Sequence, residues 1–469
     1  MSEHQQIPNN TDMPNLKGIS RRDFIRLSGM AAAGGALKLS LTGRASAGVL
    51  PAEPNQRQND FWHQVRKQFI IDPRVVYMNI GTTGAMPKQV LENYCAYNKL
   101  AASHPRTFES ELDAGFGLTS QRQNLAAQFG CQSDEICLSR NTTDGLDAII
   151  YGLALQPGDE ILITHHEHIA ALSPLNVIQD RYGVKITPVR IPVLETSYAG
   201  QFVQAFDTAI TSATKAILFS HITYKTGTRL PAKALCQLAR DNGLISIVDG
   251  AHAPGMIELD FNDMGCDFYA APGHKWQCGP GSTGILYLRN HGDNLPEFWT
   301  QNSSLYTVFV QPTGNTRGEF DIALSLQYRG QLNIPAQLAM VDACNMWERI
   351  GRDRIEAYVC GLSTYLKQSL VSRFGSDVTL FSPDIPEFTT GLTSFNPFDD
   401  LQDGARVSTL VNRLQEEAGY QVRSTNFHLE LDDQDYTYAV RVSTHIFHNE
   451  DMIDGLVDAI FDICQDMSG

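Results

Sequence analysis

Short apolar segments alternate with amphipathic segments from about residue 132 onward, and this alternation constrains the fold more than any other feature. The short apolar segments predict strands, and the amphipathic segments predict helices bounded by Gly, Pro or Asn turns. The expected strands are 136–139, 160–164, 216–222, 244–248, 267–270 and 284–288, and the expected helices among them include 144–155 and 231–242. Because strand, helix and strand follow one another repeatedly, we predict an α/β fold in which helices cover a mostly parallel sheet.

The regular alternation of strands and helices does not extend over the rest of the chain. The length of 469 residues also exceeds what one small core accommodates. The pattern is irregular to about residue 330, after which two expected helices, 334–350 and 352–374, precede short separate strands. We expect five segments, namely a leader at 1–47, an N-terminal segment at 48–78, a large domain at 79–300, a connecting segment at 301–335 and a smaller α+β domain at 336–469.

The charge and the cysteine content exclude several classes of protein. The formal net charge of −16 argues against a nucleic-acid partner, and no apolar run reaches the roughly 18 residues that a membrane span needs. Nine cysteines form an odd set without a CxxC motif. We therefore expect free thiols that act mostly as small buried apolar groups, and no disulfide framework.

The N-terminal residues carry an export pattern. Residues 20–27 read Ser-Arg-Arg-Asp-Phe-Ile-Arg-Leu, a weakly apolar stretch follows at 30–41, and Ala45-Ser46-Ala47 forms a cleavage pattern. This order resembles a twin-arginine export signal, which implies that the twin-arginine translocase carries the folded protein to the periplasm. The alternative is a disordered basic tail or an amphipathic helix.

Three groups of polar residues follow expected strands, at the edge where open α/β sheets bind ligands. Asp249 follows the strand at 244–248, and Lys275 lies in a glycine-containing turn after the strand at 267–270. Residues 140–145, Arg-Asn-Thr-Thr-Asp-Gly, join a strand to a helix, so that hydroxyls and helix N-terminal amides converge as around a phosphate. Pyridoxal phosphate needs such a set, because a carboxylate keeps its pyridine nitrogen protonated and a lysine forms the imine.

Each group alone has an ordinary structural explanation. An Asp at a strand end is commonly a turn or cap residue, a Thr-Thr pair is commonly an N-cap, and a Lys after Gly-His is commonly exposed. The order and the spacing of all three groups together favour the cofactor.

The complete pattern resembles the class V aminotransferase family over about residues 75–465. The matching motifs are Asn141-Thr142-Thr143-Asp144-Gly145-Leu146, Glu167-His168-Ile169-Ala170, Ser220-His221 with Thr226-Gly227-Thr228, Val248-Asp249-Gly250-Ala251-His252-Ala253-Pro254-Gly255, Gly273-His274-Lys275-Trp276 and Val440-Arg441-Val442-Ser443-Thr444-His445-Ile446. The fourth and fifth of these are most similar to the isopenicillin N epimerase-like branch. The resemblance implies a homodimeric fold type I pyridoxal phosphate enzyme with a mainly parallel seven-stranded sheet and a smaller C-terminal α+β domain.

The resemblance also implies roles for individual residues. Lys275 would hold the cofactor as a Schiff base and His168 would stack on its face, which makes these two the expected catalytic residues. Asp249 would contact the pyridinium nitrogen, and His252 would donate a hydrogen bond near the ring oxygen. The expected phosphate ligands are Thr142, Thr143 and His274.

Arg441 would clamp the α-carboxylate of the substrate, because a guanidinium binds a carboxylate through two parallel hydrogen bonds.

Three positions depart from the family pattern. Pro272 replaces a polar residue that usually contacts the phosphate, and Tyr224 stands where many members have Asn. Gln331 replaces the Thr with which members reach the phosphate of the partner subunit.

Two further motifs fit other sites only superficially. Residues 279–284 satisfy G-x-G-x-x-G but precede a strand instead of opening a helix, so no dinucleotide site is expected. His165, His166 and His168 lack a fourth ligand, so no metal is expected and the first two should pack at a strand end.

The pattern leaves the reaction open, because one cofactor supports epimerisation, transamination, elimination and decarboxylation. We expect a small-molecule substrate, an amino acid or a peptide-borne amino group, and an isopenicillin N epimerase-like activity. A periplasmic siderophore-tailoring enzyme is an alternative. A cysteine desulfurase needs a loop thiol, yet no cysteine occurs between Cys360 and Cys464. A cofactor-binding protein without turnover would not need both Lys275 and Arg441.

Overall fold

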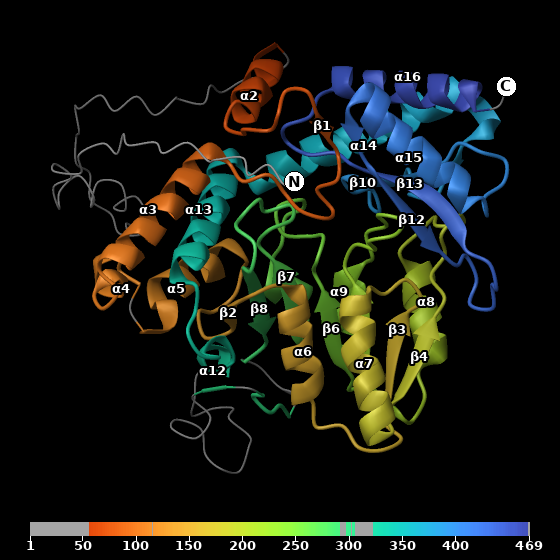
Figure 1. Cartoon of the computed structure of the whole chain (residues 1–469). Helices are drawn as coiled ribbons and strands as arrows, with labels where there is room; N and C mark the ends of the chain where they lie inside the picture. The colour runs from red at the N-terminus through yellow and green to blue at the C-terminus, as the bar shows by residue number, and fades with distance from the viewer. Residues whose placement is uncertain (1–55, 115, 291–296, 302, 305–321, 468–469) are drawn as a thin grey trace, which may run out of the picture. The chain divides into compact units, whose positions relative to one another are not determined.

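The computed structural model describes residues 56–114, 116–290, 297–301, 303–304 and 322–467 (Figure 1). The expected leader at 1–47, with its twin-arginine and cleavage patterns, lies outside these residues. Part of the expected connecting segment at 301–335 lies outside them as well. The boundaries of the five expected segments stay predictions.

A seven-stranded sheet forms the centre of the molecule, in the order β2-β8-β7-β6-β5-β3-β4. β8 runs antiparallel to its neighbours β2 and β7, and the other neighbouring strands are parallel. The strands are β2 (Ile136–Ser139), β3 (Glu160–Thr164), β4 (Lys185–Val189), β5 (Thr214–Ser220), β6 (Ile245–Asp249), β7 (Phe268–Pro272) and β8 (Gly284–Leu288). The prediction of an α/β fold with a mainly parallel seven-stranded sheet is confirmed.

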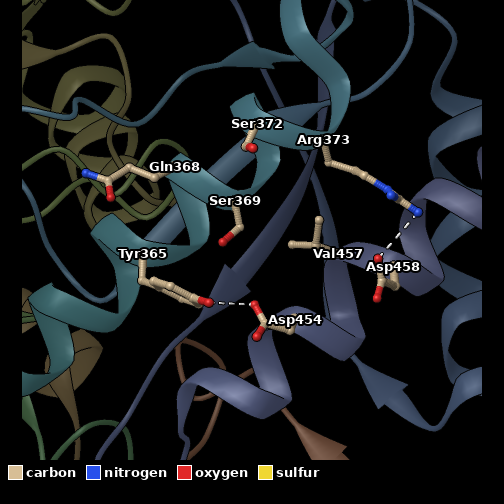
Figure 2. A pocket seen from close by; sticks show the side chains of 8 residues that line it. All are labelled: Tyr365, Gln368, Ser369, Ser372, Arg373, Asp454, Val457 and Asp458. Atoms are coloured by element: carbon tan, nitrogen blue, oxygen red, sulfur yellow. Dashed lines mark hydrogen bonds and ion pairs between the residues drawn. The ribbon is translucent and has the colours of Figure 1, made fainter.

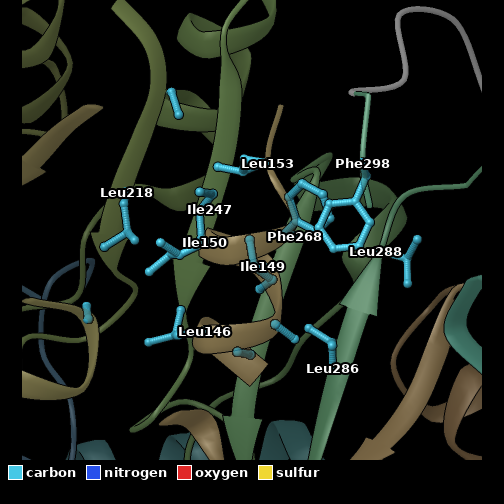
Figure 3. Packing of buried hydrophobic residues seen from close by; sticks show 14 of the residues in the cluster. Leu146, Ile149, Ile150, Leu153, Leu218, Ile247, Phe268, Leu286, Leu288 and Phe298 are labelled. Carbon is cyan, nitrogen blue, oxygen red and sulfur yellow. The ribbon is translucent and has the colours of Figure 1, made fainter. Parts of the chain in front are cut away.

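Helices bury this sheet, which explains why its inner strands are nearly continuous apolar runs. α6 (Thr142–Gly152) lies against β7, and its side chains Leu146 and Ile149 belong to one core cluster with Leu218 and Ile247 of the sheet (Figure 3). The amphipathic period seen in the sequence therefore marks the face that α6 turns toward the strands.

Other helices surround the sheet, and one long pair flanks it: α3 packs against α13. These helices are α3 (Lys88–Ser103), α4 (Phe108–Glu111), α5 (Thr119–Gln128), α7 (Ile169–Tyr182), α8 (Gly200–Ala209), α9 (Ala232–Asp241), α10 (Phe261–Met264), α12 (Ile322–Gln327) and α13 (Ile334–Ile350), with a 3₁₀ turn at Phe116–Leu118. Among the described residues, no helix combines the length and the apolar character that crossing a membrane requires.

A second, antiparallel sheet in the C-terminal part has the order β12-β13-β10-β9. Its strands are β9 (Thr379–Leu380), β10 (Leu392–Asn396), β12 (Arg423–Phe427) and β13 (Thr437–Ser443). The helices α14 (Arg352–Phe374), α15 (Gly404–Ala418) and α16 (Glu450–Asp466) share a core with it, and a 3₁₀ turn at Gly375–Asp377 follows α14. This α+β arrangement agrees with the resemblance.

The N-terminal segment connects the C-terminal part of the chain to the turn that follows β7. After α2 (Gln56–Arg66), strand β1 (Val76–Tyr77) pairs in parallel with β11 (Tyr420–Gln421). A few residues later, the backbone N–H of Gly84 donates to the carbonyl of His274, 2.7 Å away. Residues 79–84 thus lie beside the turn that carries Lys275.

Some expected element ends differ from those observed. The helix expected at 144–155 begins at Thr142, because the Asn141 side chain caps it by accepting a hydrogen bond from the Asp144 N–H (2.9 Å). It ends at Gly152. The stretch expected to be irregular contains α12, whose apolar side chains complete the central core. So short a helix shows no full amphipathic period in the sequence.

Candidate active site

The expected site residues gather at the carboxyl ends of the central strands. Asp249 is the last residue of β6, and Lys275 follows β7 by three positions. Thr142 opens α6 directly after β2, and His168 precedes α7 after β3. Because these strands point the same way, the four residues share the edge at which open α/β sheets bind ligands.

Lys275 carries an amine that is easier to deprotonate than an ordinary lysine. Its Nζ lies 3.4 Å from Nε2 of His252. Burial lowers the pKa of Lys275 to about 8; Asp249 opposes this shift, and Arg441 and Arg423 add to it. A larger share of the amine is therefore neutral near physiological pH, as a nucleophile or a proton acceptor needs.

His252 is a neutral imidazole whose tautomer is set by Trp276. Nδ1 of His252 accepts a hydrogen bond from the indole Nε1–H of Trp276 at 3.2 Å. Burial, followed by the charge of Lys275, holds the pKa of His252 well below its ordinary value. The remaining proton is therefore on Nε2, which faces Lys275 as a hydrogen-bond donor.

Asp249 is a buried carboxylate without a basic partner. Its side chain is 2% exposed, and Oδ1 accepts a hydrogen bond of 2.8 Å from the backbone N–H of Ala251. Burial raises the pKa of Asp249, whereas the charge of Lys275 lowers it. No described Lys, Arg or His forms an ion pair with it, so the site retains a carboxylate for a cationic group such as a pyridinium nitrogen.

His168 caps the start of α7 and keeps its ring at the site. Its Nδ1 accepts a hydrogen bond from the N–H of Ala170 (3.1 Å), and its ring meets the ring of Tyr224 edge-on at 4.8 Å. Burial lowers the pKa of His168 to about 4, and the charges of Lys275, Arg423 and Arg441 add to this shift. The imidazole is therefore neutral near physiological pH.

Two of the three expected phosphate ligands have unsatisfied polar atoms. Oγ1 of Thr142 and Nδ1 of His274 are buried, and neither has a hydrogen-bond partner among the described residues. Buried polar atoms in this state are rare and indicate a missing ligand. With the N-terminus of α6 beside them, they fit a phosphate. Thr143, the third expected ligand, is exposed.

Two of the three departures from the family pattern can be placed in the structure. Pro272 is the last residue of β7 and pairs with Gly284, so its backbone has no N–H to offer a phosphate. Tyr224 supports Arg441 instead, because its carbonyl accepts a hydrogen bond from Nη1 of Arg441 at 2.9 Å. For Gln331 the structure shows no contact that decides its role.

Arg441 is buried at the same place. It is 1% exposed on β13, and its Nη2 lies 3.3 Å from Oδ1 of Asn79. Its Nε is buried without a partner among the described residues. A side-chain carbon added to Gly81 would lie 3.2 Å from Nη2 of Arg441 and 3.3 Å from Cε1 of His252, so both side chains border one small space.

Comparison with known proteins identifies the family. The family described as "Aminotransferase class-V" matches residues 76–456. The chain belongs to it. It is thus a pyridoxal phosphate-dependent enzyme of the class V aminotransferase fold.

Individual relatives agree on the fold but differ in activity. The chain is 28% identical to isopenicillin N epimerase of Streptomyces clavuligerus over 85% of this chain and 97% of that protein. It is 26% identical to a "Probable cysteine desulfurase" of Methanothermobacter thermautotrophicus over 83% and 94%. Among solved structures, a C-DES mutant with glycine covalently linked to its cofactor superposes with a TM-score of 0.71 at 25% identity, covering 85% of this chain and 99% of that one.

The sequence alone does not reveal several residues of the active site. Arg423 and Thr82 reach Arg441 from other segments, and Gly84 touches the Lys275 turn. Glu167 belongs to a matching motif, but the motif indicates no role for it; the side chain is buried, and Ser220 Oγ donates to it at 2.7 Å. The sequence offers one indication of the role of Arg423. It begins β12, the strand that precedes β13 in the chain and pairs with it.

The family site is distinct from a depression of about 600 Å³ between α14 and α16 (Figure 2). Two pairs of its polar side chains contact each other: Tyr365 donates to Asp454 at 2.8 Å, and Arg373 lies 3.5 Å from Asp458. Because these four groups already pair with one another, they are not the convergent unpaired polar groups that mark a ligand site.

Proposed function

We propose that this chain is an isopenicillin N epimerase-like enzyme that acts at the α-carbon of an amino acid or a peptide-borne amino group. The observation that carries the proposal is one cluster: the Lys275 amine with its lowered pKa, the neutral His252 beside it, and the buried Arg441 across the same space. The similarity to an isopenicillin N epimerase over most of both chains supports the same class of reaction.

Pyridoxal phosphate supplies an electron-accepting ring that stabilises the negative charge developing at the α-carbon. Asp249, a buried carboxylate that forms no ion pair within the described residues, would hold a proton on the ring nitrogen. His252 would donate through Nε2–H to the ring oxygen, and His168 would cover one face. Thr142, Thr143 and His274 would hold the phosphate, the first and last with the buried polar atoms that lack partners.

Lys275 and Arg441 would act on the substrate. Nζ of Lys275 would take the proton from the α-carbon and return one, which its lowered pKa allows near neutral pH. Arg441 would bind the α-carboxylate and so fix which α-bond lies across the ring. An epimerase, a transaminase and a lyase differ in the later proton transfers, whereas removal of the α-proton by Lys275 would come first in each.

The desulfurase activity named for other relatives is not favoured. That chemistry needs a thiolate that meets the substrate, and no cysteine lies between Cys360 and Cys464. Cys278, three positions after Lys275, is fully buried, and burial raises the pKa of its thiol. A buried neutral thiol is a poor nucleophile.

We also propose that the enzyme works in the periplasm as a homodimer after export by the twin-arginine translocase. The order of the basic, apolar and Ala-Ser-Ala segments in residues 20–47 supports the export. The family resemblance supports the dimer.

Replacing Lys275 tests the assignment of the reactive lysine. In Lys275→Ala, borohydride should no longer fix the cofactor to the chain, and α-deuteration of amino acids in deuterated water should fall at least about 10³-fold, because the amine is both the attachment point and the proton carrier. Mass spectrometry of peptides and NMR of the amino acids measure the two effects.

Lys233→Ala is the matched control, since Lys233 is exposed and paired with Asp263. It should retain both properties. Cofactor still fixed by borohydride in Lys275→Ala would refute the assignment.

A further inference from the structure

Two guanidinium groups stand side by side at the active site. β12 lies beside β13 in the C-terminal sheet (Figure 1). In the register of these two strands, Arg423 on β12 is the direct cross-strand partner of Arg441 on β13. Directly opposed residues point to the same face of a sheet, with Cβ atoms about 5 Å apart. Like charges in this arrangement repel each other and lower the stability of the sheet, unless an anion binds between or beside them.

The groups around the pair are neutral. Thr82 Oγ1 accepts from Nη1 of Arg423 at 3.3 Å and lies 3.5 Å from Nη2 of Arg441. The other partners of Arg441 are the carbonyl of Tyr224 and the amide oxygen of Asn79. No described Asp or Glu forms an ion pair with either guanidinium, although the whole chain has a net charge of −16.

The two arginines differ in how far they are exposed to solvent. Arg441 is almost completely buried, and burial followed by the charge of Arg423 lowers its pKa to about 10. Arg423 is exposed. The pair therefore leads from an inner guanidinium, beside His252 and Lys275, to an outer one at the solvent side.

The groups expected at the site leave Arg423 without an anion. In the proposed function the cofactor phosphate lies at Thr142 and His274, the ring nitrogen faces Asp249, and the substrate α-carboxylate binds Arg441. A single guanidinium fork matches one carboxylate in charge and shape.

We propose that Arg423 binds a second carboxylate of the substrate, so that the enzyme prefers dicarboxylic amino compounds. This inference rests on the proposed function, because it uses Arg441 as the site of the first carboxylate. The α-carboxylate enters deep in the site, and the second carboxylate stays near the opening. Arg423 is thereby a specificity-determining residue.

Calorimetric titration of the loaded enzyme with carboxylates that lack an amino group tests the proposal without turnover. The probes are succinate, glutarate and adipate, each compared with butyrate, pentanoate or hexanoate of the same chain length at constant ionic strength. At the best length, the dicarboxylate should bind roughly 10-fold or more tightly than its monocarboxylate. Arg423→Gln should reduce this preference to about 2-fold or less and leave monocarboxylate binding unchanged.

Two further variants separate the possible explanations. Arg181→Gln removes one positive charge from an exposed position of α7 and should keep the preference. Arg441→Lys should weaken monocarboxylates and dicarboxylates together, because it loses the inner fork.

Two results would overturn the inference: a wild-type enzyme without dicarboxylate preference, or an Arg423→Gln variant that weakens both kinds of probe equally. The second result would mean that both arginines hold one carboxylate. α-Deuteration of alanine reports separately on the proposed function. It should persist if only the inference fails, and it should be absent if the proposed chemistry itself is wrong.

Discussion

The neutral state of the groups around Lys275 follows from burial in the presence of other cations. His168 and His252 would both lose solvation on charging, and both would face the positive charges of Lys275 and Arg441. The same two causes lower the pKa of Lys275 itself. A cluster of this kind costs stability in order to keep reactive groups unprotonated.

The lowered pKa of Lys275 predicts how cofactor capture depends on pH. The neutral amine is the nucleophile, so in enzyme freed of cofactor the capture rate should rise with pH and level off above a midpoint near pH 8. Arg441→Gln removes a charge that lowers this pKa, so its midpoint should be higher than that of the wild type. Stopped-flow absorbance after mixing with pyridoxal phosphate measures the rate.

A small lysine analogue, Nα-acetyl-lysine amide, serves as the reference, with a midpoint near the ordinary lysine pKa of about 10.4. If the enzyme followed the reference curve, burial would not control Lys275.

Sequence alone locates some of these residues and not others. Asp249 and Lys275 could be predicted because each follows a strand whose apolar pattern is clear, and strand ends meet at one edge. Thr82 and Arg423 could not, because their place depends on a segment docking from far away in the chain and on the register of two strands. A shift of one residue in that register would turn Arg423 to the opposite face.

At the scale of elements, apolar runs define the central strands closely. The strands at 136–139, 160–164 and 284–288 coincide with those expected, because turn residues delimit them on both sides. Two-residue strands such as β1 and β11 leave no such pattern. Yet the parallel pairing of these two brings residues 79–84 to the active site.

The close approach of Gly84 to the Lys275 turn predicts an effect of one added methyl group. In Gly84→Ala, the new Cβ would lie 2.0 Å from the carbonyl oxygen of Lys275, so one of the two segments must move. We expect the variant to fold with its central sheet intact but to lose about 1–3 kcal/mol in the fit of the turn, and with it cofactor affinity. Cofactor dissociation constants and urea unfolding midpoints measure the two effects.

Gly281→Ala is the control, because no atom lies within 4 Å of a Cβ at Gly281, on the segment between the Lys275 turn and β8. This variant should bind the cofactor as the wild type does. Equal cofactor affinity in the two variants would show that the contact at Gly84 does not hold the turn.

At the scale of the whole molecule, charge is unevenly distributed. The chain has a net charge of −16, whereas at the described active site the charges of Arg441 and Arg423 both act on Lys275, and Asp249 partly opposes them. A positive pocket in a negative protein concentrates small anions locally and repels polyanions from the remaining surface. The cofactor and a carboxylate substrate are both small anions, so this charge distribution favours their binding.

Export is the prediction that concerns the molecule as a unit. Pyridoxal phosphate is made in the cytoplasm, and the site that would hold it combines β2, β6, β7 and β13, so it exists only in the folded chain. A translocase that carries folded proteins would permit loading before transport. No disulfide joins the nine cysteines, all of which lie in the described part of the chain, and this agrees with folding in a reducing compartment. We expect the wild-type enzyme outside the inner membrane, shortened at about Ala47 and carrying cofactor.

Changing Arg21 and Arg22 together to Lys should instead leave a full-length, yellow, folded enzyme in the cytoplasm, because the translocase requires the arginine pair and the change keeps both positive charges. Fractionation, N-terminal sequencing and absorbance of both forms measure location, cleavage and loading. The matched control is Lys17→Arg, which keeps the charge and the arginine pair and should be exported normally. Wild-type enzyme that stays cytoplasmic and uncleaved, in a host with a working twin-arginine system, would show that residues 1–47 are a basic tail.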